Sequence, residues 1–317
     1  MTEPWRLLAL PPMPKELLEL LFGDERLEVV VPAERTQAAV EELVPTVDLL
    51  LGDWTPQLRI TTPGERVCFV QQPSVGTDGI DLDACAAAGV PVANCAGSNS
   101  VSVAEWCVGA TLNVLRKTLQ ADQAVRRGEW PQTELGGREL AGSKVGIVGM
   151  GPIGVHAARL YTAFGCDVTY WSRSQKPDAP ATWQDLDELI TTSDVVVLVI
   201  ALGPQTRGLV DPRRMKPGSV LVHAARGEVL VEEAVAEAVA AGVLFALDVF
   251  STEPLPMDDP VRELDGVLLS PHLAGSSQQA AMRIVAQAKA NLQRALAGEP
   301  VLDVVNAADP VVRRRRS

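Results

Sequence analysis

The 317-residue chain has few aromatic residues and no apolar run long enough to cross a lipid bilayer. Aromatic residues make up 4% of it, and apolar runs such as 195–200 (VVVLVI) are strand-sized, far short of the roughly 20 residues that span a membrane. Residues 1–10 lack a basic segment followed by an apolar core and a small-residue cleavage site. These absences argue against a membrane or secreted protein and predict a cytoplasmic location.

Paired cysteines are absent as well. The chain contains no C-x-x-C pair and an odd number of cysteines, so neither a disulfide framework nor a metal site is indicated. We therefore expect buried thiols in a reducing compartment, and no bound metal. The five cysteines are Cys68, Cys85, Cys95, Cys107 and Cys166.

Positive charge is also scarce. The chain has 28 lysines and arginines against 40 aspartates and glutamates, which gives a formal net charge of −12. A surface of that sign repels phosphate backbones and anionic lipids, so nucleic acids and membranes are not expected partners. The exception is the run 313–316 (RRRR), which we interpret as a disordered, solvated end rather than as an anion site.

Short apolar runs alternate with amphipathic runs along the first third of the chain. Such alternation predicts an α/β protein, in which helices cover both faces of a parallel sheet. Amphipathic runs at 15–22 and 36–43 are the predicted helices. The predicted strands are 6–10, 27–31, 47–51, 67–70 and 90–93.

A long helical stretch from about Ser102 to Arg127 leads into a second series of strands. This series has six members, the number that a full dinucleotide-binding sheet requires. A last helix is predicted from about Ser277 to Leu296. The six strands are 144–149, 167–171, 195–200, 219–223, 244–249 and 267–270.

A glycine-rich segment follows the first strand of the second series. Residues 149–154 (GMGPIG) have the form G-x-G-x-x-G, stand after an apolar strand and open a helix, which is the context of a dinucleotide-binding loop. Gly149 permits the tight turn, Gly151 lets backbone amides approach a pyrophosphate, and Gly154 lets the helix pack closely. Met150, Pro152 and Ile153 complete the predicted cofactor-binding segment.

The end of the next strand bears on the choice of cofactor. NAD sites usually carry an acid there, bound to the ribose 2′-hydroxyl. This chain has Ser172 at that position, followed by Arg173 and Ser174, groups that would bind a 2′-phosphate. We therefore predict NADP as the preferred cofactor, with an NAD enzyme of degenerate sequence as the alternative.

Three chemically coherent residues follow other strands of the same series. Arg226, Glu253 and His272 come after the strands 219–223, 244–249 and 267–270, and so at the same sheet edge as the glycine loop. Each could be an ordinary loop residue. Together beside a cofactor loop they favour catalysis.

The three residue types suit the reduction of a 2-oxo acid. The arginine fork binds a carboxylate through two hydrogen bonds, and the histidine can protonate the oxygen that becomes a hydroxyl. The glutamate beside it favours the imidazolium form. The predicted reaction is hydride transfer between NAD(P)H and a small 2-oxo or 2-hydroxy acid.

These residues and their surroundings resemble the D-isomer-specific 2-hydroxyacid dehydrogenase family over nearly the whole chain. Several matching motifs in the same order make the resemblance specific. The motifs are 75–94, 97–109, 126–130, 149–154, 223–230, 247–254 and 270–275.

The resemblance implies roles for individual residues. Arg226 would bind the substrate, His272 would act as acid and base, and Glu253 would pair with His272. Backbone amides at Val75 and Gly76 would receive the substrate carboxylate, and Asp248 would hold the nicotinamide carboxamide. The remaining implied cofactor-binding residues are Ala201, Leu202, Thr206, Ala225 and Gly275.

The resemblance also implies the architecture: a flavodoxin-like substrate domain into which a Rossmann cofactor domain is inserted. Residues 1–97 with 284–317 would form the first and residues 98–283 the second. The helix from Ser102, with apolar residues such as Trp106 and Leu112, would build a homodimer interface. D-specificity and a glyoxylate or hydroxypyruvate type of substrate are expected by resemblance alone.

Some features depart from the family pattern or leave other functions open. The family usually has asparagine where His223 stands and proline where Ala201 stands; we interpret His223 as a packing or cofactor-adjacent residue. No further C-terminal regulatory domain is recognised, which argues against the full-length phosphoglycerate dehydrogenase type. The alternatives are a formate or phosphite dehydrogenase, which Glu253 disfavours, and a cofactor-sensing protein resembling corepressors.

Overall fold

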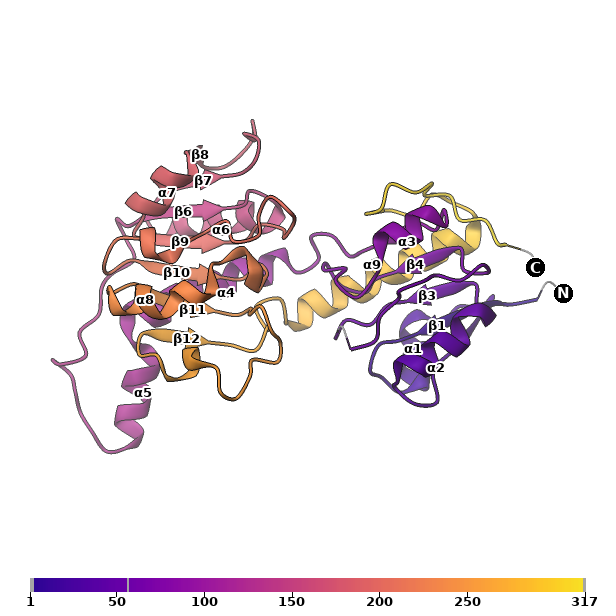
Figure 1. Cartoon of the computed structure of the whole chain (residues 1–317), viewed down its shortest axis with the longest axis horizontal. Coiled ribbons are helices and arrows are strands. Elements are labelled where there is room, and N and C mark those ends of the chain that lie inside the picture. The colour runs from indigo at the N-terminus through magenta and orange to yellow at the C-terminus, as the bar shows by residue number, and fades with distance from the viewer. Residues whose placement is uncertain (1–2, 56, 316–317) are drawn as a thin grey trace. The chain divides into compact units, whose positions relative to one another are not determined.

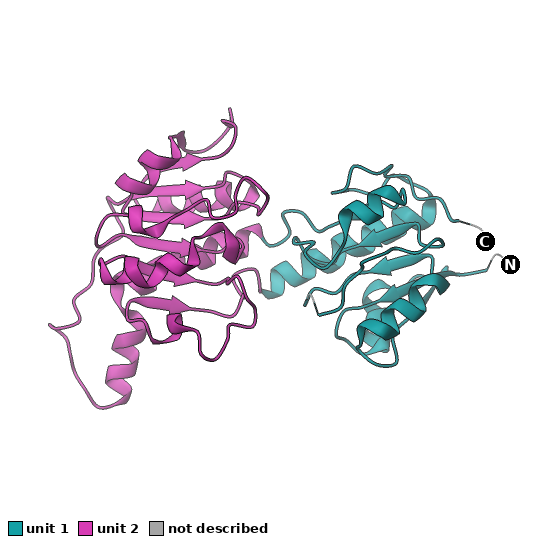
Figure 2. Ribbon diagram, viewed as in Figure 1, with its two compact units in different colours: residues 1–99, 277–317 teal, residues 100–276 magenta. Residues whose placement is uncertain are grey.

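A computed structural model of the protein describes residues 3–55 and 57–315. The chain forms two compact α/β units, residues 1–99 together with 277–317 and residues 100–276 (Figure 2). The predicted class, two parallel-sheet α/β domains, is confirmed. The substrate and cofactor functions assigned to the two parts of the sequence stay predictions.

The first unit is built on a five-stranded parallel sheet in the order β2-β1-β3-β4-β5 (Figure 1). This is the flavodoxin-like strand order expected for the unit. The strands are β1 (Trp5–Ala9), β2 (Leu27–Val30), β3 (Leu49–Leu51), β4 (Phe69–Gln71) and β5 (Val92–Ala93). The helices are α1 (Lys15–Phe22), α2 (Gln37–Leu43), α3 (Leu82–Ala87) and α9 (Gln278–Ala297).

The sequence explains where helices of the first unit begin and end. The side chains of Thr36, Asp81 and Ser277 accept amide hydrogens of the first turns of α2, α3 and α9, as N-cap residues do. At its other end α9 stops at Gly298, which has a φ of 71° that favours glycine. Along β1, Leu7 packs into one apolar cluster and Leu8 into another, so both faces of the sheet are buried.

The second unit is built on a seven-stranded parallel sheet in the order β12-β11-β10-β9-β6-β7-β8 (Figure 1). All six predicted strands are present, and the two-residue β8, too short to give a pattern, was missed. The strands are β6 (Lys144–Val148), β7 (Asp167–Trp171), β8 (Thr182–Trp183), β9 (Val195–Leu198), β10 (Val220–His223), β11 (Leu244–Leu247) and β12 (Val267–Leu269). The helices are α4 (Ser100–Arg116), α5 (Thr118–Arg126), α6 (Pro152–Ala163), α7 (Leu186–Thr192) and α8 (Val235–Ala240).

Helices cover both faces of this second sheet. Side chains of α4 and α6 belong to the apolar cluster on one face, and side chains of α7 and α8 to the cluster on the other. The strand order changes direction between β6 and β9, and an open parallel sheet binds ligands beyond the strand ends at such a point. The glycine-rich loop follows β6, at this position.

The helical stretch predicted from Ser102 to Arg127 is present, but it is not one continuous helix. It is two helices, because Lys117 has a φ of 52° and ends the regular path between α4 and α5. The apolar residues of α4 that we assigned to a dimer interface face their own unit instead. Trp106 and Leu112, for example, are partly buried and pack against its apolar core.

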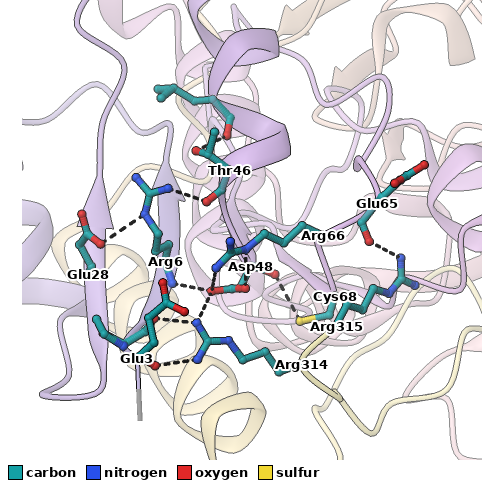
Figure 3. Close-up of polar contacts among 12 residues, drawn as sticks. Glu3, Arg6, Glu28, Thr46, Asp48, Glu65, Arg66, Cys68, Arg314 and Arg315 are labelled. Carbon is teal, nitrogen blue, oxygen red and sulfur yellow. Dashed lines mark hydrogen bonds and ion pairs between the residues drawn. The ribbon is translucent and has the colours of Figure 1, made fainter. Parts of the chain in front are cut away.

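Within the run 313–316, Arg314 and Arg315 are not solvated ends, whereas Arg313 is exposed as predicted and Arg316 lies outside the described residues. Figure 3 shows Arg314 and Arg315 against the first unit. Arg314 donates to the carbonyls of Glu3 and Pro4 and, at 3.1 Å, to the buried carboxylate of Asp48. Its guanidinium also lies 5.2 Å from the ring centre of Trp5. The prediction failed because a compositional argument does not detect an acid buried elsewhere in the chain.

All five cysteines are buried free thiols, as predicted. Burial raises the pKa of the Cys68 thiol to about 12 and that of Cys85 to about 11. None of the helices described is both long and apolar enough to cross a membrane. Over residues 3–55 and 57–315, no group of three or more His, Cys, Asp or Glu side chains could hold a metal ion.

Candidate functional site

The carboxyl ends of the parallel strands in the second unit meet at one edge, and the glycine-rich loop begins there. Gly149 has a φ of 111°, and a Cβ at this position would lie 2.7 Å from the Val199 carbonyl oxygen. At Gly154 a Cβ would lie 2.1 Å from the carbonyl oxygen of Gly149. Both positions therefore require glycine, one for the turn and one for close packing of helix against strand.

The same loop leaves room for a ligand. Gly151 is the N-cap of α6; it has no side-chain cap, and a Cβ built on it would meet nothing within 4 Å. The start of α6 thus presents backbone donors and the positive end of the helix dipole next to open space. These residues fit the pyrophosphate of a dinucleotide.

The residues that follow β7 lie at the adjacent strand end. Ser172 is buried, and its hydroxyl donates to the Ser174 carbonyl at 2.7 Å. Arg173 and Ser174 are exposed. No carboxylate occupies the position where an acid would bind a ribose 2′-hydroxyl, and a cationic side chain stands beside it.

The segment after β9 is held by Thr206. Its hydroxyl donates to the Ala201 carbonyl and accepts the amide hydrogen of Gly203, both at 2.8 Å. Thr206 is buried, whereas Ala201 is exposed and Leu202 is half-buried. The structure thus gives Thr206 a structural role, with Ala201 and Leu202 on the accessible side.

His272 and Glu253 form the closest contact between predicted catalytic residues. Nδ1 of His272 lies 2.7 Å from Oε2 of Glu253, and Oε1 of Glu253 accepts the Phe250 amide hydrogen at 3.0 Å. Partial burial alone would raise the pKa of Glu253, but the hydrogen bonds from His272 and Phe250 and the charges of His272 and Arg226 lower it. The glutamate is therefore ionised at neutral pH, and about half of the imidazole is exposed.

Arg226 lies near enough to this pair for its charge to lower the pKa of Glu253. It precedes the 3₁₀ turn η3 (Gly227–Val229), and its guanidinium donates to the carbonyl of Ala225 at 2.8 Å. A Cβ on Gly227 would lie 2.0 Å from the backbone of Phe250. The loop after β10, which carries Arg226, therefore packs directly on the loop after β11, which carries Glu253; we call these loops the Arg226 and Glu253 connections. The structure thus brings the three predicted catalytic groups together within one unit.

Asp248 has a role that sequence reasoning missed. Its carboxylate is 1% exposed and accepts hydrogen bonds from the Ser270 hydroxyl at 2.5 Å and from the Leu273 and Ala274 amides, each at 2.8 Å. The Asp248 carbonyl accepts the amide of His272, whose φ is 52°. Asp248 thus holds the unusual backbone turn that presents His272. In the sequence, this role could have been inferred from an acid directly after one strand and a serine, Ser270, directly after the next.

The predicted carboxylate-binding amides belong to the first unit, after β4. Asn94 donates to the Val75 carbonyl at 2.7 Å, and Ser74 donates to the Gly76 carbonyl at 2.7 Å. Gln72 in turn donates to the Ser74 hydroxyl at 2.8 Å. Among the residues that the structure describes, no group accepts the amide hydrogens of Val75 and Gly76. The carbonyls of this segment are held by hydrogen bonds, and its amides are available for an anion.

The fold and the glycine-rich loop define a dinucleotide-binding α/β protein. Residues 108–274, slightly more than half of the chain, match the domain described as "D-isomer specific 2-hydroxyacid dehydrogenase, NAD binding domain". The chain belongs to this family, as the resemblance in the sequence indicated. The match supports a nicotinamide cofactor.

Individual relatives extend the similarity to most of the chain. The chain is 35% identical over 280 residues to D-3-phosphoglycerate dehydrogenase of Mycobacterium tuberculosis. The aligned residues make up 85% of this chain but only 53% of that protein. The chain thus spans about half the length of such relatives. It is 32% identical to hydroxypyruvate reductase of Thermotoga maritima, over 86% of this chain and 92% of that protein. A glyoxylate reductase structure from Paecilomyes thermophila superimposes with a TM-score of 0.85 at 25% identity, covering 96% and 99% of the two chains.

Proposed function

We propose that this protein is a nicotinamide-dependent oxidoreductase that reduces a small 2-oxo acid to a D-2-hydroxy acid, with glyoxylate or hydroxypyruvate as the type of substrate. The observation that carries the proposal is the Glu253–His272 hydrogen bond beside Arg226, at the strand edge where the dinucleotide loop begins. Hydroxypyruvate reductase and glyoxylate reductase among the similar proteins support the substrate class.

The chemistry divides among the residues of the second unit. The guanidinium of Arg226 binds the substrate carboxylate, because its planar fork matches two carboxylate oxygens. Since Nδ1 of His272 is hydrogen-bonded to Glu253, Nε2 is the atom that donates the proton to the carbonyl oxygen. The nicotinamide, when bound, supplies the hydride. Glu253 orients the imidazole through the hydrogen bond to Nδ1.

We assign the carboxylate-binding amides of the first unit, at Val75 and Gly76, to the same substrate. Their carbonyls are held by Asn94 and Ser74, so the amides have a fixed orientation. Backbone donors fixed in this way bind an anion without reordering. With this role, the first unit, residues 1–99 with 277–317, forms the substrate domain.

NADP is the cofactor we propose as preferred. The exposed Arg173 and the absence of an acid at Ser172 favour a 2′-phosphate, since a carboxylate there would repel it. NAD binds through the same pyrophosphate and nicotinamide contacts, which makes the preference a matter of degree.

We further propose a cytoplasmic homodimer. The most exposed large apolar side chains of the second unit include Leu119 and Val125 on α5 and Trp130 just after it, with exposed fractions of 48%, 53% and 78%. Apolar side chains of this size in one segment mark a surface that a second copy would cover. Light scattering after gel filtration tests this: Trp130→Glu should lower the mass of the particle to that of one chain.

The experiment that tests the function is a panel of 2-oxo acids assayed with NADPH and with NADH. Glyoxylate, hydroxypyruvate, its 3-phosphate and pyruvate are assayed as oxidants, and formate and phosphite as reductants. Turnover of a 2-oxo acid supports the proposal. Oxidation of formate or phosphite alone, or tight cofactor binding with no turnover at all, contradicts it and favours the alternative dehydrogenase or a cofactor sensor.

A further inference from the structure

The side chain of His223 is buried in the second unit without a hydrogen-bond partner. It ends β10, is 1% exposed, and neither ring nitrogen is paired within the part of the chain that the structure describes. A buried polar group without a partner destabilises the folded state relative to an apolar side chain of similar size. Packing alone therefore gives no reason for a histidine here.

The surroundings of the ring are apolar on the sheet side. Side chains alternate along a strand, so His223 lies on the same face as Leu221, which belongs to the cluster covered by α7 and α8. In the neighbouring strands its partners in register are Leu198 and Leu247, both in that cluster. An apolar residue would complete this cluster.

On its other side the ring faces the two connections that carry proposed catalytic groups. The ring lies close to the backbone of Gly227 and Arg226 without a hydrogen bond to it, and the charges of Arg226 and Glu253 act on it. The amide of Asp248, where the loop with Glu253 begins, donates to the His223 carbonyl at 3.0 Å. The same two connections touch each other where Gly227 packs on Phe250, whose amide holds Glu253. His223 thus lies buried at the end of β10, where the loop that carries Arg226 meets the loop that carries Glu253.

The ring carries no charge in this position at neutral pH. Burial lowers the pKa of His223 to about 4. A proton on the ring would place a second cation next to Arg226 in an apolar environment. A neutral polar ring can contact the loop backbone without competing with Arg226 for Glu253.

We propose that His223 is a positioning residue for the proposed reduction, and that its buried ring sets the spacing between the guanidinium of Arg226 and the carboxylate of Glu253. The proposal rests on the proposed function, since Arg226 and Glu253 have these roles only in that reaction. His223 touches neither substrate nor cofactor in this assignment. It acts through Arg226 and the Phe250–Glu253 backbone.

Three variants separate positioning from packing. His223→Leu replaces the planar ring by a branched side chain of similar size, so the KM of the 2-oxo acid should rise about tenfold through Arg226, with a smaller fall in kcat. His223→Asn keeps a polar group, and kcat/KM should stay within about threefold of the parent. Leu221→Met, a volume-conserving change on the same face, is the control for packing and should leave both constants close to the parent.

A second measurement does not depend on turnover. The chain has three histidines, so selective ¹⁵N labelling gives three imidazole signals, and His223→Asn identifies one of them. We expect the His223 ring to stay neutral from pH 8 to pH 5, and its resonances to shift in Arg226→Ala and in Glu253→Gln. This measurement tests the junction even where His223→Leu does not fold.

The outcomes distinguish this inference from the proposed function. If the parent enzyme turns over a 2-oxo acid and His223→Leu has unchanged KM and kcat, His223 is a core residue and the inference is wrong. Resonances of His223 that do not respond to Arg226→Ala or to Glu253→Gln overturn it as well. A parent protein without turnover contradicts the proposed function, while the resonance shifts still report whether His223 senses the two connections.

Discussion

Glu253, in the loop after β11, is hydrogen-bonded to His272, in the loop after β12. One of its carboxylate oxygens lies 2.7 Å from Nδ1 of His272, and the other accepts the amide hydrogen of Phe250, in its own loop, at 3.0 Å. The glutamate therefore has one orientation, and it gives the imidazole one orientation in turn. That arrangement leaves Nε2 of a half-exposed ring as the atom that can exchange a proton with a ligand. Two predictions about catalysis depend on it.

Removing the imidazole should abolish most of the activity. We predict that His272→Ala lowers kcat at least ~10²-fold, because a positioned acid typically contributes 10²- to 10⁴-fold, while cofactor affinity changes little. Glu253→Gln keeps the ring and loses only its charged partner, so its kcat should fall less. Steady-state kinetics and cofactor titration measure both effects. His156→Ala, a histidine on α6 without an assigned role, is the control; unchanged turnover in His272→Ala would remove His272 from the mechanism.

Both carboxylate oxygens of Asp248 accept hydrogen bonds from the turn that presents His272. In Asp248→Asn an amide nitrogen replaces one of two oxygens that accept backbone hydrogens from Leu273 and Ala274, so one donor faces another. We predict a fall in kcat of about tenfold or more together with a loss of stability of about 1–3 kcal/mol. Urea unfolding and steady-state kinetics measure the two quantities. Parent-like values of both would show that the turn holds without the carboxylate.

The sequence allowed the fold and the neighbourhood of the site to be predicted for a physical reason. Parallel strands that are buried on both faces, such as β9, are continuous apolar runs, and residues after them must meet at one sheet edge, as Arg226 and His272 do. Contacts between distant segments could not be predicted. The pairing of Arg314 with Asp48 joins residues 266 positions apart, and no local pattern marks it.

The same limit explains the missed helix break and the missed function of Asp248. The change of direction at Lys117 depends on a backbone conformation that lysine adopts only under tertiary constraint. The three hydrogen bonds of the Asp248 carboxylate come from backbone and hydroxyl groups more than twenty residues away. Residue type at a strand end indicates that a site exists there, and the three-dimensional contacts decide what each residue does in it.

Cofactor choice should respond to one substitution after β7. In Ser172→Asp a carboxylate stands where it can bind a ribose 2′-hydroxyl and would repel a 2′-phosphate. We predict that the ratio of kcat/KM for NADPH to that for NADH falls at least about tenfold. Arg173→Ala should lower the ratio too, by removing the cation. Ratios equal to the parent's in both variants would contradict an NADP preference determined at this strand end.

The C-terminal arginines should contribute to stability unequally. Burial alone would raise the pKa of Asp48, but hydrogen bonds from Arg66, from the amide of Arg6 and from Arg314 lower it, so the carboxylate is buried in its charged form (Figure 3). Removing one partner of a buried charge destabilises the fold, and we predict a loss of about 1.5–3 kcal/mol for Arg314→Ala in urea unfolding.

The neighbouring arginine provides a matched control for this stability measurement. Arg313 pairs with Asp309 on the surface, where both side chains are more than half exposed. Arg313→Ala should therefore change the free energy of unfolding by no more than about 0.5 kcal/mol. Equal losses in Arg313→Ala and Arg314→Ala would mean that the contact with Asp48 contributes nothing specific.

Stability at acid pH should depend on His223. The pKa of this residue falls from 6.5 to about 4 on folding, because burial disfavours the charged ring. Above pH 6.5 the ring is neutral in both states and has no effect. As the pH falls from 6.5 to 4, the unfolded chain takes up a proton that the folded chain does not, so the free energy of unfolding decreases.

The size of the effect follows from the pKa difference at about 1.4 kcal/mol per unit. Between pH 7 and pH 4.5 the parent protein should lose about 2–3 kcal/mol more than His223→Asn, which has no group to titrate at that position. Urea unfolding at a series of pH values measures both proteins, and carboxylates common to the two cancel in the comparison. Identical pH dependence in parent and variant would mean that the His223 ring takes up its proton as readily in the folded protein as in the unfolded chain.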